Sequence, residues 1–188
     1  LTAPAFQVKL YVPLARPGLA LLQRLFGNFF ITSYVKAKFL TQDAQRVRSY
    51  DEDPLITRAI SARVLLGLYD AADRVVADAP AIRLPLQLLI SEKDWVVHRA
   101  PQDRFFERLG SPVKERHLLP GFLHDTLGER DRQLAIDRIR AFIERMFHEP
   151  VAADSLLQAD RSGYTRDEEI RLGRPLPRFS PRAMNFAL

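Results

Sequence analysis

Two residues of the sequence, Asp94 and His124, have the types and the spacing that acid–base chemistry needs. Asp94 follows an apolar run at 84–90, and His124 follows a second one at 113–119. An Asp that accepts the hydrogen bond of an imidazole Nδ1 fixes the tautomer, and the other ring nitrogen then takes a proton from a nucleophile. The plainer alternative is that Asp94 caps the following helix and His124 is an ordinary loop histidine. Considered together, their positions favour catalysis.

The secondary structure predicted around Asp94 and His124 explains why the two residues should meet. The two runs have strand length, residues 99–109 and 131–147 have helical periodicity, and Gly-Ser-Pro at 110–112 separates the first helix from the second strand. A strand–helix–strand–helix order is typical of a parallel α/β sheet covered by helices. The loops at the carboxyl ends of parallel strands lie at one edge of the sheet, where open α/β folds bind ligands. We therefore expect Asp94 and His124 to come together there.

The rest of the chain is expected to be mostly helical up to residue 80. Residues 1–6 read as the end of a buried core strand, 17–30 as a helix, 41–53 as a loop or helical turn, and 54–78 as a long helix starting at Pro54. The helix at 17–30 carries an apolar stripe that we expect to pack on the core, with a lipid-facing role as the alternative. Its members are Leu21, Leu22, Leu25, Phe26, Phe29 and Phe30. Residues 148–188, rich in proline and arginine, read as a linker or docking tail.

Composition limits the other kinds of site. The sequence has 188 residues and no cysteine, which excludes a thiolate metal site and a cysteine nucleophile. We predict no metal and no cofactor. His98, His117 and His148 are expected to be structural, because they lie in a loop, within a strand and at a helix end.

The net charge of +5 is uneven, since residues 1–50 carry seven Lys or Arg and a single acid, Asp43. These basic residues are spread singly, which favours a solvated surface over a binding patch, and we predict no nucleic-acid partner. No apolar stretch approaches the ~20 residues of a membrane span. No signal peptide is visible, so a cytoplasmic location is expected. The first residue is Leu1 and not Met, which suggests a piece of a longer protein.

Three motifs give a resemblance to a known family. They are S-E-K-D-W-V-V at 91–97, F-F-E-R-L-G-S at 105–111 and L-P-G-F-L-H at 119–124. Together they resemble the C-terminal half of an α/β-hydrolase of the monoacylglycerol lipase and lysophospholipase-like branch, also called the serine aminopeptidase type. Ser91 departs from the pattern, because relatives usually have glycine three residues before the acid.

The resemblance implies a domain plan and a site. It implies that Thr2-Ala3-Pro4 ends the sixth strand, that residues 7–80 are a helical cap, and that 81–147 complete the core. It makes Asp94 and His124 members of a Ser–His–Asp triad, whose serine lies on a G-x-S-x-G elbow earlier in the chain. None of the eight serines here lies in such an elbow. We therefore expect the nucleophile and the oxyanion hole outside this chain, which would be catalytically incomplete by itself.

The tail carries a weaker resemblance. Gly163–Arg166, Arg174–Pro177 and Ser180-Pro181 are similar to the segment that follows the hydrolase in certain bacterial fusions with an S-adenosylmethionine-dependent methyltransferase. No methyltransferase motif occurs here, so this implies a fused methyltransferase domain only in the parent protein.

Two functions remain at this point. The first is a serine hydrolase that cleaves carboxylic esters, such as lipid acyl esters, with His124 as base and Asp94 as its orienter. Its cap would cover an apolar acyl pocket and would be the part able to contact a membrane surface. A different nucleophile, such as the Asp of dehalogenases, fits the same fold. The second is a non-catalytic interaction module, in which the carboxylate of Asp94 and the imidazole of His124 would point apart.

Overall fold

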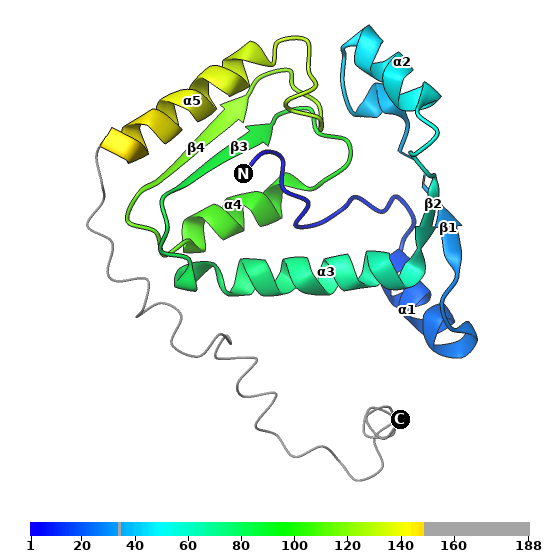
Figure 1. Ribbon diagram of the computed structural model, residues 1–188. Coiled ribbons are helices and arrows are strands. Elements are labelled where there is room, and N and C mark those ends of the chain that lie inside the picture. The colour runs from blue at the N-terminus through cyan, green and yellow to red at the C-terminus, as the bar shows by residue number, and fades with distance from the viewer. Residues whose placement is uncertain (34, 149–188) are drawn as a thin grey trace, which may run out of the picture. The chain divides into compact units, whose positions relative to one another are not determined.

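The computed structural model describes residues 1–33 and 35–148, and Figure 1 shows their arrangement. The predicted tail at 148–188 lies outside the described residues, apart from His148. The elements in chain order are α1 (Ala15–Phe26), β1 (Phe30–Thr32), η1 (Ala37–Phe39), α2 (Ala44–Glu52), β2 (Ala59–Ser61), α3 (Ala62–Ala77), η2 (Ala79–Ala81), β3 (Leu86–Ser91), α4 (Arg99–Arg108), β4 (Lys114–Leu119) and α5 (Gln133–His148).

The core sheet has the predicted parallel pairing. β3 and β4 lie side by side in parallel, with a register that runs from Leu86 opposite Lys114 to Ser91 opposite Leu119. On the other edge of β3, Thr2 forms a parallel bridge to Leu89. Three consecutive residues of β3, at 88–90, are almost completely buried, as expected for a strand covered on both faces.

Helices cover both faces of this sheet (Figure 1). On one face, α4 and the end of α3 enclose a cluster that contains Phe6, Ala79 and Phe105, and the rings of Phe6 and Phe105 lie 4.7 Å apart. On the other face, Ala135 and Ile139 of α5 pack on Leu89 and Leu119. The sheet therefore sits between two helical layers, with the carboxyl ends of β3 and β4 at one edge.

A polar network on the outer strand holds α5 against β4. The Glu115 carboxylate accepts hydrogen bonds from Arg145, His117 and Gln87. Burial raises the pKa of Glu115, but these hydrogen bonds and the charge of Arg145 outweigh burial and lower it to about 2. His117 also contacts Arg138 of α5, so its surroundings are those of the structural residue that was predicted.

Three helices differ from the prediction. The helix expected from Pro54 begins at Ala62, because the Ser61 hydroxyl accepts the amide hydrogen of Val64 and caps the helix there. The residues before it form β2, which pairs antiparallel with β1. The helix expected at 17–30 ends at Phe26, because Gly27 takes a positive φ of 74°. Residues 44–52 form a complete helix, capped by Asp43, instead of a single helical turn.

The expectation that the apolar stripe of α1 packs on the core is wrong for the described chain. No residue of α1 is buried, and Phe26 is 75% exposed. The helix packs against α3, where Arg16 forms ion pairs with Asp70 and Asp73, so it stands outside the sheet layers. An amphipathic pattern specifies an apolar face but not the partner on which that face packs.

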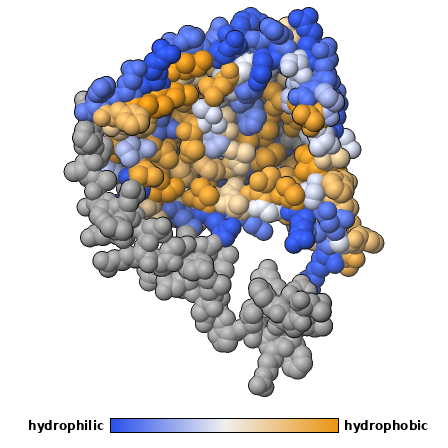
Figure 2. Space-filling model, in the orientation of Figure 1, coloured by the Kyte–Doolittle hydropathy of each residue, from blue (hydrophilic) through white to orange (hydrophobic). Residues whose placement is uncertain are grey.

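Apolar side chains also gather on a hollowed face of the molecule. Figure 2 shows them as a broad orange area inside a hydrophilic rim, on the side that presents β3, α4 and the N-terminal segment in Figure 1. An apolar area of this kind is typical of a surface that is covered by another part of a protein or by a partner. Among the described residues, no helix is long and apolar enough to cross a bilayer.

Gly110 gives a stability prediction for the turn between α4 and β4. A Cβ at this position would overlap the carbonyl oxygen of Pro80, which belongs to the backbone and cannot swing aside. We expect Gly110→Ala to lower the free energy of unfolding by about 1–3 kcal/mol. Urea denaturation followed by circular dichroism measures this change.

Gly67 supplies the matched control. It lies within α3, and a Cβ there would meet nothing within 4 Å. Gly67→Ala should raise the free energy of unfolding by about 0.5–1 kcal/mol, because alanine favours the helix. Equal stability of the two variants would contradict the close approach of Gly110 to Pro80.

Candidate active site

Asp94 and His124 meet as predicted at the carboxyl edge of the sheet. The Nδ1 atom of His124 lies 2.8 Å from Oδ2 of Asp94. The Asp94 side chain is 7% exposed and the His124 side chain 25% exposed. The carboxylate is thus shielded from water, while the imidazole keeps contact with the surface. This is the arrangement in which a carboxylate orients a proton-transferring histidine.

The second oxygen of Asp94 holds the loop that carries it. Oδ1 accepts hydrogen bonds from the amides of Val96, at 2.7 Å, and Val97, at 2.9 Å. The following helix, α4, has His98 as its N-cap and receives no side-chain cap. The plainer alternative requires Asp94 to cap α4, and Asp94 does not do so. Its two oxygens serve the loop and the imidazole.

The electrostatic surroundings keep the Asp94 carboxylate ionised. Burial raises its pKa, but the hydrogen bonds from His124 and from the Val97 and Val96 amides, together with the charge of His124, outweigh burial. The net result is a pKa below the ordinary value for Asp. An ionised Asp94 favours the tautomer of His124 that carries its proton on Nδ1 and has Nε2 free to accept one.

The N-terminal segment supports the acid loop from outside. Val8 forms an antiparallel bridge with Val97, and Nζ of Lys9 donates to the Asp94 carbonyl oxygen at 2.6 Å. Neither residue was singled out from the sequence. Their role depends on contacts between residues about 85 positions apart, for which the sequence offers no local signal.

Ser91, which stands where relatives usually have glycine, makes a specific contact in the structure. It is 3% exposed, and its hydroxyl lies 3.1 Å from that of Thr126 in the His124 loop. The contact joins the end of β3 to the loop that follows β4. From the sequence, Ser91 was noted only as a replacement of the usual glycine, and its contact with Thr126 was missed.

One apolar pocket lies beside the acid loop. It has a volume of about 320 Å³ and is lined by Tyr11, Val35, Phe39, Trp95 and Val96. Two of the lining residues directly follow Asp94. The pocket thus brings together the segment at 11–39, part of the predicted cap, and the acid loop.

Comparison with known families agrees with this arrangement. The model of the serine aminopeptidase S33 family, a hydrolase family, matches residues 1–131. The chain belongs to the serine aminopeptidase S33 family. A second model, described as "Putative methyltransferase", matches residues 139–188. The two matches confirm the resemblance to a hydrolase followed by a segment related to methyltransferase fusions.

Two relatives share sequence with the chain. "Uncharacterized protein YnbC" of Escherichia coli K12 is 53% identical over 178 residues, which are 94% of this chain and 30% of that protein. "Putative monoglyceride lipase" of Schizosaccharomyces pombe is 26% identical over 132 residues, which are 69% of this chain and 35% of that protein. The chain thus spans about a third of the length of these relatives.

Solved structures confirm the α/β-hydrolase fold. The monoacylglycerol lipase of Paleococcus ferrophilus gives a TM-score of 0.68 at 20% identity and covers 76% of this chain and 57% of that one. A soluble variant of monoglyceride lipase from Saccharomyces cerevisiae, in complex with a substrate analog, gives 0.67 at 15% identity and covers 77% and 52%. The described residues therefore form part of an α/β-hydrolase fold.

Proposed function

We propose that this chain supplies the acid and the general base of a Ser–His–Asp hydrolase that cleaves carboxylic esters. The observation that carries the proposal is the 2.8 Å contact between Asp94 and His124 at the carboxyl edge of the sheet. Nε2 of His124 takes the proton of the serine hydroxyl as the oxygen attacks the acyl carbon. The resulting imidazolium, stabilised by Asp94, then gives that proton to the leaving alcohol. Water repeats the two transfers and releases the acid.

The serine of this mechanism belongs outside the chain. In the family's order it precedes the acid and the base, and no G-x-S-x-G elbow occurs in this sequence. Ser91, the serine next to the acid loop, is buried and bonded to Thr126. The chain alone would therefore lack both the nucleophile and the oxyanion hole, which is usually the largest single contribution to such catalysis.

The interaction-module alternative requires the carboxylate and the imidazole to point apart. A 2.8 Å contact from a carboxylate that is also held by two backbone amides supports the hydrolase instead. A docking surface has no evident use for a carboxylate that fixes the tautomer of a histidine.

The apolar pocket beside the acid loop supports a lipid acyl ester as substrate. Its lining is aromatic and aliphatic, which suits a hydrocarbon chain and disfavours a charged peptide terminus. Several relatives are named as monoacylglycerol or monoglyceride lipases. Monoacylglycerols and lysophospholipids, whose esters carry one acyl chain, are the substrates we propose.

The test compares esters with amides in the protein that contains this chain. We expect hydrolysis of p-nitrophenyl decanoate and at least about 100-fold lower kcat/KM for an amino-acid p-nitroanilide. Phe39→Ser should lower kcat/KM for the decanoate about 10-fold, because burying an aromatic side chain contributes about 1.5–3 kcal/mol. The same variant should change kcat/KM for p-nitrophenyl acetate little.

Phe147→Ser is the matched control, since Phe147 lies on α5 and is 83% exposed. It should leave kcat/KM for both esters unchanged. Preference for the anilide would contradict the ester assignment. An equal loss for acetate and decanoate in Phe39→Ser would contradict the acyl pocket.

A further inference from the structure

Glu129 is a buried carboxylate that the proposed mechanism does not use. It lies five residues after His124 and is 2% exposed. Its Oε1 accepts the amide hydrogen of Leu123 at 2.9 Å, and its Oε2 accepts those of Gln42 at 3.0 Å and Arg130 at 3.2 Å. Burying a carboxylate is costly unless its oxygens are well bonded. The three peptide donors meet this requirement and tie together two distant segments of the chain.

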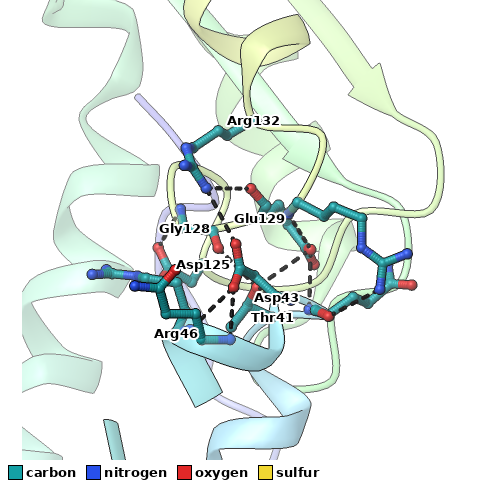
Figure 3. Close-up of polar contacts among 10 residues, drawn as sticks. Thr41, Asp43, Arg46, Asp125, Gly128, Glu129 and Arg132 are labelled. Carbon is teal, nitrogen blue, oxygen red and sulfur yellow. Dashed lines mark hydrogen bonds and ion pairs between the residues drawn. The ribbon is translucent and has the colours of Figure 1, made fainter. Parts of the chain in front are cut away.

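The same two segments share further backbone contacts. Residues 40–43 lie just before α2, and residues 121–132 carry His124. The amide of Asp125 donates to the Leu40 carbonyl at 2.7 Å, and the Thr41 hydroxyl donates to the Gly128 carbonyl at 2.8 Å. Figure 3 shows Thr41, Asp43, Gly128 and Glu129 gathered where the two segments meet.

These contacts fix the backbone on both sides of the imidazole. The residue before His124, Leu123, is held by Glu129, and the residue after it, Asp125, is held by Leu40. The place of the ring relative to Asp94 therefore depends on where the segment 40–43 stands. That segment belongs to the predicted cap, which otherwise would only cover the substrate.

We propose that Glu129 is a positioning residue for His124, which couples the loop carrying the base to the cap segment 40–43. The inference rests on the proposed function of His124 as general base. A shift of about 1 Å in a reacting group can cost about 100-fold in rate, so even a small displacement of this loop would slow catalysis. Glu129 is not among the residues that line the apolar pocket, so we expect substrate binding there to be unaffected by its replacement.

Glu129→Gln tests the coupling with little change in volume. The amide presents its NH₂ group to one set of the peptide donors, so either Leu123 or Gln42 loses its acceptor. We expect kcat to fall about 10-fold to 100-fold, with KM for p-nitrophenyl butyrate within about 2-fold of wild type. Each rate is divided by the number of active sites titrated with a serine-directed phosphonate, so that misfolded protein does not count.

Arg46→Gln is the matched control. It removes a contact of 3.4 Å at the exposed surface between Arg46 of α2, the helix that follows segment 40–43, and Asp125 of the His124 loop. Its kcat should stay within about 2-fold of wild type. If Glu129→Gln only lowers the number of titratable sites and leaves kcat per site unchanged, the role of Glu129 is purely structural and the proposal is overturned.

A second measurement separates this proposal from the proposed function. The proton on Nδ1 of His124 is observed by NMR in ¹⁵N-labelled protein, where its signal reports the contact with Asp94. We expect Glu129→Gln to shift or broaden this signal and Arg46→Gln to leave it unchanged. An unchanged signal in both variants overturns the positioning role, whatever the activity. Hydrolysis that persists in His124→Ala would instead overturn the proposed function.

Discussion

Replacing Asp94 with asparagine should lower the kcat for ester hydrolysis about 10⁴-fold, because an amide no longer stabilises the productive tautomer of His124. The asparagine side chain would keep the shape of the original, and its oxygen could still accept hydrogen bonds from the Val96 and Val97 amides. It would then present NH₂ to Nδ1 of His124, which leaves the imidazole proton on Nε2, where the ring cannot accept another. The loss should appear in kcat far more than in KM.

The lowered pKa of Asp94 fixes the pH range of this effect. Since the folded pKa of Asp94 lies below the ordinary value for Asp, the carboxylate is ionised throughout the neutral pH range. The stability that this ionisation contributes is present above the unfolded pKa and is lost as pH falls through the folded pKa. Between about pH 6 and 9, protonation of Asp94 should therefore contribute nothing to the pH dependence of the ratio of wild-type to Asp94→Asn kcat.

Asp137→Asn controls for the loss of a negative charge. Asp137 lies on α5, where its exposed side chain accepts a hydrogen bond from Gln133, and it makes no described contact with the site. Its kcat should match that of wild type. An Asp94→Asn variant with more than about a tenth of the wild-type kcat would remove Asp94 from the mechanism.

Replacing His124 with alanine should have the largest effect, a fall of about 10⁶-fold in kcat. Without the imidazole the proposed general base is lost, and the serine stays a weak nucleophile. His98→Ala is the matched control, because His98 belongs to the same edge of the sheet but forms the N-cap of α4. It should retain wild-type kcat, and a comparable loss in both variants would point to misfolding of the edge.

The pairing of Asp94 with His124 was predictable because it follows from topology alone. Each residue lies in the loop after an apolar run of strand length, and parallel strands bring such loops to one edge. No knowledge of side-chain contacts was needed. Apolar periodicity placed α5 close to its observed bounds, and the Gly-Ser-Pro at 110–112 placed the end of α4.

The parts that were missed depend on contacts that leave no local pattern. β1 and β2 have three residues each, too few to show alternation, and so the start of α3 was placed at Pro54 instead of after Ser61. The contact of Glu129 with Gln42 joins residues 87 positions apart. A glutamate in a loop normally predicts an exposed side chain. Only the fold shows that this one is surrounded by peptide N–H donors.

The most direct test of the central claim is to locate the residue that a serine-directed phosphonate modifies. The protein that contains this chain is treated with the reagent, digested and mapped by mass spectrometry, with His124→Ala treated in parallel. We expect one modified serine, outside the 188 residues and within a G-x-S-x-G sequence, and labelling that is lost in His124→Ala. Modification of one of the eight serines in this chain, or no His124-dependent labelling at all, would contradict it.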